Sequence, residues 1–166
     1  TQTGQNDVWI LSHANGLGGA SAWTQITTVG NSPLQQWGHP AVYDTTNNRM
    51  IVYGTQLGIL SNANGLGNET STWTQLTPLG ITPSQRSYSS SVYDSMNNRM
   101  TIFGGSNRND TWVLANANGK GGSPFWTQLT PTGSIPPIRS YHTAVYDNSN
   151  NKMIIFGGLN PVELND

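Results

Sequence analysis

Three short polar segments recur along the chain and carry residue types that suit binding. They read Gln36-Trp37-Gly38-His39, Arg86-Ser87-Tyr88-Ser89 and Arg139-Ser140-Tyr141-His142. An arginine offers a fork of donors to a carboxylate, and a tyrosine offers an amphipathic ring that suits peptides and sugars. A ligand site is therefore one interpretation. In the other, Arg86 and Arg139 pair within the fold, while His39 and His142 pack or cap. Both stay open for the arginines, and the second is favoured for the histidines.

Tryptophan is repeated in the same way, with one exception. Five tryptophans recur at matching positions, and we expect each to bury its large apolar face between sheets: Trp9, Trp23, Trp73, Trp112 and Trp126. Trp37 is not repeated, because Ser87 and Ser140 stand at the matching positions. An aromatic ring that stands alone in a loop is a candidate ligand contact.

Catalytic chemistry has little support in the sequence. The three histidines, His13, His39 and His142, are scattered and make a poor metal site. Asn-rich turns hold the repeated carboxylates, and an Asx-turn explains these without acid–base chemistry: Asp44, Asp94 and Asp147. The Asn-Gly loops at 61–65 and 114–119 lack the carboxylates of a calcium site. We expect no catalytic residue, no metal and no cofactor.

Composition narrows the partners. The 166 residues carry a net charge of -1, and only 9% of them are charged, far below the roughly 25% of an ordinary soluble domain. This excludes a nucleic-acid binder that works by bulk electrostatics. No apolar run approaches the ~20 residues that span a bilayer, so no membrane partner is expected. The absence of cysteine excludes thiolate chemistry. Low charge with abundant Asn and Thr favours an extracellular, secreted protein, in which Asn68 and Asn109 match the glycosylation pattern.

The elements that must position these side chains are copies of one unit. The Trp-Thr-Gln motif at Trp23 returns after 50 and then 53 residues, and the Val-Tyr-Asp motif at Val42 keeps the same spacings. Within each unit, runs rich in β-branched and aromatic residues alternate with Gly, Pro, Asn and Asp. The third unit predicts strands at 111–115, 125–130, 141–146 and 152–157. Its turn at 147–151 predicts an antiparallel hairpin.

Four-stranded units with a period near 50 residues resemble the kelch repeat, which builds β-propellers. The resemblance rests on glycine pairs after apolar strands, on the tryptophans that follow and on the Arg-Ser-Tyr-His run: Ile102-Phe103-Gly104-Gly105, Ile155-Phe156-Gly157-Gly158, Asp110-Thr111-Trp112-Val113-Leu114, Trp126 and 139–142. It implies an all-β fold, a kelch-type β-propeller segment of four-stranded antiparallel blades. Some kelch enzymes are copper oxidases that use a cysteine-crosslinked tyrosine, which a chain without cysteine cannot form.

The resemblance also implies where a ligand would bind. In kelch proteins, the loops that lead into the innermost strand and those after the glycine pair line one face of the ring. The residues that these loops place there are His39, Arg86, Tyr88, Asn107, Arg108, Arg139, Tyr141 and His142. With Trp37, they form the predicted binding site.

The repeats divide into two complete blades and two half blades. We expect half blades at about 6–27 and 141–158, and blades at about 39–77 and 87–130. Gly58 stands where the next unit has tryptophan, so the first blade should be looser. Because propellers typically have four to eight blades, the half blades need partners. Two copies could close head to tail as a homodimer with a six-bladed ring. Alternatively, a longer chain supplies the remaining blades, or more copies close a larger ring.

These features predict a non-catalytic binding or scaffold module. It would recognise a peptide or carbohydrate through the loop face of a propeller completed by self-association. One alternative is a segment of a longer secreted kelch protein or enzyme whose active groups lie elsewhere. Another is a purely structural, self-assembling scaffold.

Overall fold

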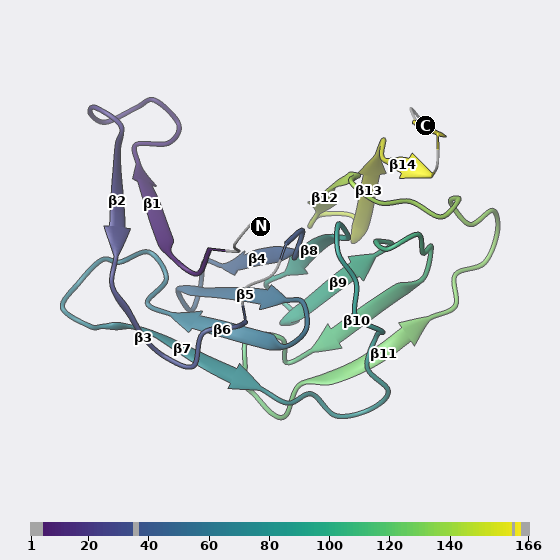
Figure 1. The fold of residues 1–166 in the computed structure, drawn as a ribbon, viewed down its shortest axis with the longest axis horizontal. Helices are drawn as coiled ribbons and strands as arrows, with labels where there is room; N and C mark the ends of the chain where they lie inside the picture. The colour runs from purple at the N-terminus through teal and green to yellow at the C-terminus, as the bar shows by residue number, and fades with distance from the viewer. Residues whose placement is uncertain (1–4, 35–36, 161, 164–166) are drawn as a thin grey trace.

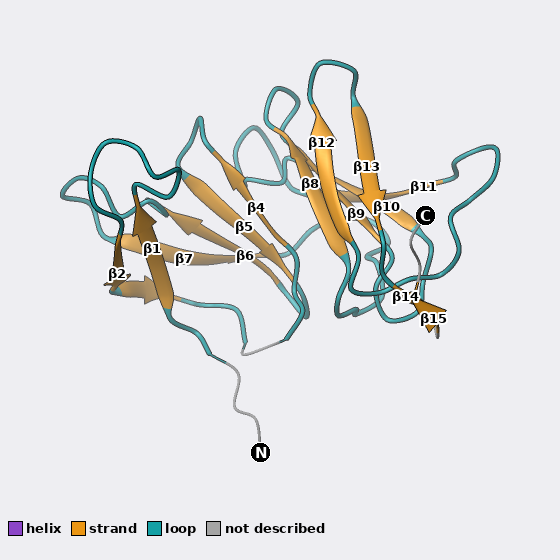
Figure 2. Cartoon of the chain, turned by 90° about the horizontal axis from the view of Figure 1, so that it is seen from above, coloured by secondary structure: helices purple, strands orange, loops and turns teal. Residues whose placement is uncertain are grey.

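The computed structural model describes residues 5–34, 37–160 and 162–163, and every regular element among them is a strand (Figure 1). Within these residues, no helix is long and apolar enough to span a membrane. Two whole sheets occupy the middle of the chain, and a separate pair of strands lies on either side of them. Figure 2 shows these sheets standing one after another along an open arc.

The first whole sheet is antiparallel, and its four strands are paired in chain order. They are β4 (Ala41–Asp44), β5 (Arg49–Tyr53), β6 (Leu57–Ser61) and β7 (Ser71–Leu76). A short additional strand, β3 (Thr28–Gly30), runs parallel to β7 at the outer edge. The second whole sheet has the same order and direction. Its strands are β8 (Ser90–Asp94), β9 (Arg99–Phe103), β10 (Thr111–Ala115) and β11 (Phe125–Leu129).

Two strand pairs flank the whole sheets. The N-terminal pair contains β1 (Val8–Ser12) and β2 (Ala22–Ile26), and the C-terminal pair contains β12 (Thr143–Asp147) and β13 (Lys152–Phe156). A small hairpin of β14 (Leu159–Asn160) and β15 (Val162–Glu163) follows. The all-β prediction of four-stranded antiparallel sheets is confirmed. The strand predicted at 141–146 begins two residues late, because Tyr141 has a φ of 63° and is not extended.

The first whole sheet is well packed, which corrects the expectation that Gly58 would loosen it. Ile51 and Leu60 are fully buried. A Cβ atom on Gly58 would overlap Cγ of Pro33 and would lie 3.4 Å from the indole of Trp73. Pro33, in the segment after β3, therefore occupies the space that a larger side chain would need at position 58.

The main core lies between the two whole sheets. Its buried side chains come from β5 and β6, and from β9, β10, β11 and the loop after β10: Ile51, Tyr53, Leu57, Ile59, Met100, Ile102, Trp112, Leu114, Ala117 and Trp126. The rings of Tyr53 and Trp126 meet edge to face at 4.9 Å. On the opposite face of the first whole sheet, a smaller cluster contains Val52, Leu60 and Trp73, with Val8 of β1 against it. This sheet therefore packs on both faces, as a sheet between two neighbours must.

Candidate functional site

The three recurrent polar segments meet before the inner strands β4, β8 and β12, of which β8 contacts both others. Gly38, Tyr88 and Tyr141 occupy matching positions, with φ values of 59°, 60° and 63°. The amide of Tyr88 donates to the carbonyl of Gly38 at 2.6 Å, and the amide of Tyr141 donates to the carbonyl of Tyr88 at 3.0 Å. These hydrogen bonds link one left-handed residue of each unit to the next.

Two aromatic rings stack on this backbone link. The ring centroids of Tyr88 and Tyr141 are 4.0 Å apart, with 22° between their planes. A Cβ on Gly38 would lie 2.6 Å from Cε1 of Tyr88, so the Tyr88 ring covers the glycine. Tyr141 in turn stacks on Tyr88 and remains 59% exposed. A hydrogen bond with Tyr88 raises the pKa of Tyr141.

The left-handed conformation of the two tyrosines is energetically costly. For a residue with a Cβ, it costs roughly 1–2 kcal/mol, and such residues cluster at binding and catalytic sites. The backbone hydrogen bonds and the ring contact hold Tyr88 and Tyr141 in place despite this cost. The loop before the inner strands is therefore a rigid aromatic platform, which we call the tyrosine platform and define as Gly38, Tyr88 and Tyr141.

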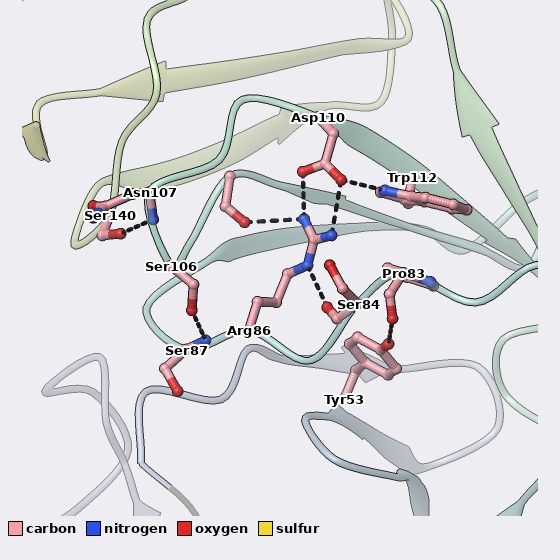
Figure 3. A network of polar contacts seen from close by, with 11 residues as sticks. Tyr53, Pro83, Ser84, Arg86, Ser87, Ser106, Asn107, Asp110, Trp112 and Ser140 are labelled. Carbon is pink, nitrogen blue, oxygen red and sulfur yellow. Dashed lines mark hydrogen bonds and ion pairs between the residues drawn. The ribbon is translucent and has the colours of Figure 1, made fainter.

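Arg86 lies beneath the surface and does not face a ligand, which corrects the first interpretation of this residue. It is 3% exposed, and its Nη1 and Nη2 donate to the two carboxylate oxygens of Asp110 at 2.6 and 2.9 Å (Figure 3). Nη1 also donates to the carbonyl of Gly104 at 3.1 Å, and Nε donates to the carbonyl of Ser84 at 3.2 Å. Arg86 thus pairs within the second whole sheet, as the alternative interpretation proposed.

Asp110 completes this buried network. Its carboxylate also accepts a hydrogen bond from Nε1 of Trp112 at 2.7 Å. Burial alone would raise the pKa of Asp110, but the hydrogen bonds from Arg86 and Trp112 and the charge of Arg86 hold it below its usual value. No site role is predicted for Asp110 from the sequence, although its place two residues before a repeated tryptophan is a signal. The network fixes the loop after β9 to the segment before β8.

Arg139 repeats this arrangement in the C-terminal pair. It is 1% exposed, its Nε donates to the carbonyl of Pro137 at 3.3 Å, and its Nη1 donates to the carbonyl of Gly157 at 3.0 Å. The expectation that its guanidinium faces a ligand is therefore corrected as well. The loops at Gly104-Gly105 and Gly157-Gly158, which we call the glycine-pair loops, are each held by a buried guanidinium group. One arginine can donate to several backbone carbonyls at once.

His142 is buried rather than exposed to a ligand. It is 8% exposed, and its Nε2 lies 2.7 Å from the hydroxyl of Ser90, which is 7% exposed. Burial lowers the pKa of His142, and the positive charge of Arg139 lowers it further. A serine next to a histidine resembles a nucleophile with its base. Here the pair is buried, and Nδ1 has no hydrogen-bond partner among the described residues that would orient the ring. The contact joins β8 to the loop before β12.

The other predicted residues lie at or near the surface in different places. Trp37 is 57% exposed beside Gly38. His39, which follows Gly38, is exposed and lines a cleft next to β1, away from the stacked rings of Tyr88 and Tyr141. Asn107 is exposed, and its backbone N–H donates to the hydroxyl of Ser140 at 3.3 Å, which places Asn107 beside Tyr141.

Arg108 is half-buried, and its backbone bridges that of Arg139. The described residues contain no cluster of three or more side chains that could hold a metal ion. The structure thus brings together Tyr88, Tyr141 and Asn107, and it leaves His39 in a separate cleft.

A family model described as the KLHDC2/KLHL20/DRC7 Kelch-repeats domain matches residues 57–166. Among solved structures, the chain is similar to that of YjhT, with a TM-score of 0.50 and 18% identity over 74% of this chain. The match covers 33% of the YjhT chain. At this identity the likeness concerns the fold alone. No curated protein matches the chain.

Proposed function

Because the chain belongs to the kelch-repeat family, we propose that it is a non-catalytic binding module whose loop face recognises a ligand in a propeller completed by self-association. Domains of this family generally act as protein-interaction scaffolds. The blade limits at about 6–27, 39–77, 87–130 and 141–158 belong to the same proposal. The ligand classes that fit are carbohydrate and peptide.

The observation that carries the proposal is the exposed ring of Tyr141. It stacks on Tyr88 at 4.0 Å and presents its outer face to solvent, with 59% of the residue exposed. Both residues have a positive φ that the fold sustains against its cost. A rigid aromatic ring offers contact area with little loss of side-chain entropy on binding. The tyrosine platform is therefore suited to a flat ligand surface.

The burial of the arginines favours a neutral ligand. With Arg86 and Arg139 at 3% and 1% exposure, the exposed polar residue beside Tyr141 is Asn107, whose side chain is a neutral carboxamide. The negative face of a tyrosine ring attracts the C–H groups of a sugar, and an amide both donates and accepts hydrogen bonds. A neutral carbohydrate fits this chemistry best. An extended peptide is the second candidate, because tyrosine and asparagine also suit adaptable peptide contacts.

Saturation-transfer NMR with cellohexaose, xylohexaose and chitohexaose tests the proposal. Tyr141→Ala should weaken binding of the oligosaccharide that gives a signal by about tenfold, since aromatic stacking contributes ~0.5–1.5 kcal/mol beyond buried area. The matched control is Tyr43→Ala, which removes a 42% exposed ring at the hairpin end of β4 and should leave binding unchanged. Equal losses in both variants, or no loss in Tyr141→Ala, would contradict the proposed site. Binding only to an arrayed peptide library would move the assignment to peptides.

Two alternative functions, a structural scaffold and a segment of a longer kelch protein, make different predictions. A purely structural scaffold would bind neither oligosaccharides nor peptides, although it would still self-associate. A segment of a longer kelch protein or enzyme would need further blades for any activity.

We also propose an extracellular location, which the low charge and the exposed acceptor residues Asn68 and Asn109 support. A loss of mass after treatment with an N-glycosidase, measured on the protein from its source, would agree with glycosylation at those residues.

A further inference from the structure

Tryptophans that are buried in the whole sheets are exposed in the N-terminal pair. Trp9 matches Trp112 of the second whole sheet, but it is 50% exposed where Trp112 is 6% exposed. Trp23 matches Trp126, and the exposures are 65% and 2%. Trp112 and Trp126 lie in a four-stranded sheet that packs against a neighbouring sheet. Among the described residues, the N-terminal pair has neither inner strands beside it nor a sheet that covers Trp9 and Trp23.

The C-terminal pair shows the same contrast. Val145 is 59% exposed, whereas the matching Val92 is 5% exposed. Phe156 is 61% exposed, whereas the matching Phe103 is 4% exposed. The C-terminal pair contains only the two inner strands of a sheet, and the N-terminal pair contains only the two outer strands. Each pair has the strands that the other lacks.

Clefts at the two ends of the chain match these exposed side chains. One lies between the second whole sheet and the C-terminal pair, and its apolar lining includes Phe103, Leu129, Met153 and Ile155. The other lies between the N-terminal pair and the first whole sheet, and its lining includes Val8, Met50, Val52 and Trp73. In the main core, Trp112 packs against the first whole sheet from the corresponding position. By analogy with Trp112, the cleft beside the C-terminal pair would receive the Trp9 and Trp23 side chains of another copy of the chain. The cleft beside the N-terminal pair would receive the Val145 and Phe156 side chains of another copy.

We infer that a second copy of this chain completes both pairs, with β13 of one copy antiparallel to β1 of the other. The inference rests on the proposed self-association and names its contacts. In the second whole sheet, Val113 of β10 pairs with Thr101 of β9. The matching register sets Ile10 of one copy opposite Ile154 of the other. Because the same contacts form at both junctions, two copies satisfy the open edges of the described N-terminal and C-terminal pairs in a closed two-fold ring.

A polar contact between the two whole sheets shows how neighbouring units recognise each other. The Nδ2 of Asn118 donates to Oδ2 of Asp44 at 2.6 Å, and Nη1 of Arg49 donates to the carbonyl of Asn118 at 2.6 Å. Asp44 and Asn118 are 1% and 3% exposed. The hydrogen bonds from Asn118 and Asn47 lower the pKa of Asp44 despite its burial, so the carboxylate stays ionised. We call this arrangement the inter-sheet latch.

Each half of the inter-sheet latch recurs at the open ends of the chain. Asp94 with Arg99 and Asp147 with Lys152 repeat the acidic half, on the second whole sheet and the C-terminal pair. Asn64 and Asn15 repeat the amide half, on the first whole sheet and the N-terminal pair. The backbone N–H of Asn64 donates to Oδ1 of Asn48 at 2.9 Å, as the backbone N–H of Asn118 donates to Oδ1 of Asn98 at 3.0 Å. In the closed ring, Asn15 of the second copy reaches Asp94, and Asn64 of the second copy reaches Asp147.

The closed ring also extends the tyrosine platform. Its next hydrogen bond would run from the amide of Gly38 in the second copy to the carbonyl of Tyr141, by the pattern that joins Gly38, Tyr88 and Tyr141 within one chain. This step sets Trp37 of the second copy near the exposed Tyr141 ring. The non-repeated tryptophan then belongs to the same loop face as the stacked tyrosines.

Sedimentation equilibrium of the 166-residue chain and of two variants tests the contacts. The unchanged chain should sediment at twice its mass of 17.9 kDa. Asn15→Asp should raise the dimer dissociation constant at least tenfold, because a second carboxylate then faces Asp94. Aspartate at position 15 keeps an Oδ1 atom, which in Asn15 accepts the hydrogen bond from the backbone N–H of Leu17 at 3.0 Å. Its matched control is Asn68→Asp, which adds the same charge in an exposed loop.

A second variant addresses the apolar contact. Trp23→Lys should abolish the dimer, whereas Leu17→Lys, at a residue that is 73% exposed in a loop, should not. A chain that is monomeric at all concentrations, or that forms a larger species, overturns both the proposed two-copy ring and this inference. A dimer that Asn15→Asp and Trp23→Lys weaken no more than their controls overturns the named contacts and leaves self-association standing.

Discussion

Arg86→Ala perturbs the buried ion pair that holds the second whole sheet to its glycine-pair loop. The variant removes a side chain whose exposure is 0% and whose guanidinium contacts both carboxylate oxygens of Asp110. It also leaves the carbonyls of Gly104 and Ser84 without their donor. The folded protein then contains a carboxylate that has lost its cationic partner and keeps the hydrogen bond from Trp112, and two carbonyls that have each lost a donor.

The size of the effect follows from this loss. Breaking a buried ion pair by removing one partner destabilises a protein by about 3–5 kcal/mol. The side chain of Asp110 is 24% exposed, so water can solvate the remaining carboxylate in part, and the lower end of that range applies. We therefore expect the free energy of unfolding to fall by about 3 kcal/mol, which is a large share of the 5–15 kcal/mol that is typical of a domain.

Urea denaturation at one protein concentration measures this free energy. The control is Arg108→Ala, since Arg108 is half-buried and its Nε has no hydrogen-bond partner among the described residues. We expect the control to change stability by about 1 kcal/mol or less. A loss below about 1 kcal/mol in Arg86→Ala, or equal losses in the two variants, would refute the assignment of Arg86 to a buried structural pair.

Three further predictions concern the glycine, the histidine and the core. Gly38→Ala should cost more than the roughly 1–2 kcal/mol of a positive φ, because its Cβ would overlap Tyr88, whereas Gly133→Ala, with open space around its Cβ, should cost that amount alone in the same urea assay. The lowered pKa of His142 means that the unfolded chain takes up a proton near pH 6.5 while the folded chain does not, so stability should fall as pH drops below that value. His142→Gln should lose this pH dependence between pH 8 and pH 5, and an unchanged slope would contradict it. Trp126→Ala, at a residue that is 2% exposed, should cost about 3–5 kcal/mol in thermal or urea unfolding, and a loss below about 1 kcal/mol would contradict its place in the core.

Local pattern accounts for most of the fold. The strand predicted at 111–115 matches β10, because the run from Thr111 to Ala115 combines β-branched and aromatic residues between turn residues. Pro33 shows where this reasoning fails. It fills the space beside Gly58 from a segment outside the repeated motif, and no spacing along the chain reports such a contact.

The sequence predicts where the tyrosines of the candidate site lie, but it does not predict the role of each residue near them. Tyr88 and Tyr141 do lie together before the inner strands, because matching positions in consecutive repeats become neighbours in space. The same positions could not show that Arg86 points inward. That outcome depends on Asp110, which the pairing of β9 with β10 places beside Arg86. The positive φ of Tyr141 was likewise hidden, since tyrosine ordinarily favours a strand.

Disulfide trapping tests the completed ring most directly, because the native chain has no cysteine. In the double variant Ile10→Cys/Ile154→Cys, the inferred register places the two cysteines opposite each other across the junction between copies. Oxidation should then give a disulfide-linked dimer of twice 17.9 kDa, which a reducing agent should convert back to monomers. Ile10→Cys/Lys152→Cys, displaced by two residues or about 7 Å along the strand, should remain uncrosslinked. Absence of the covalent dimer in the first variant, or equal yields in both, would contradict the account.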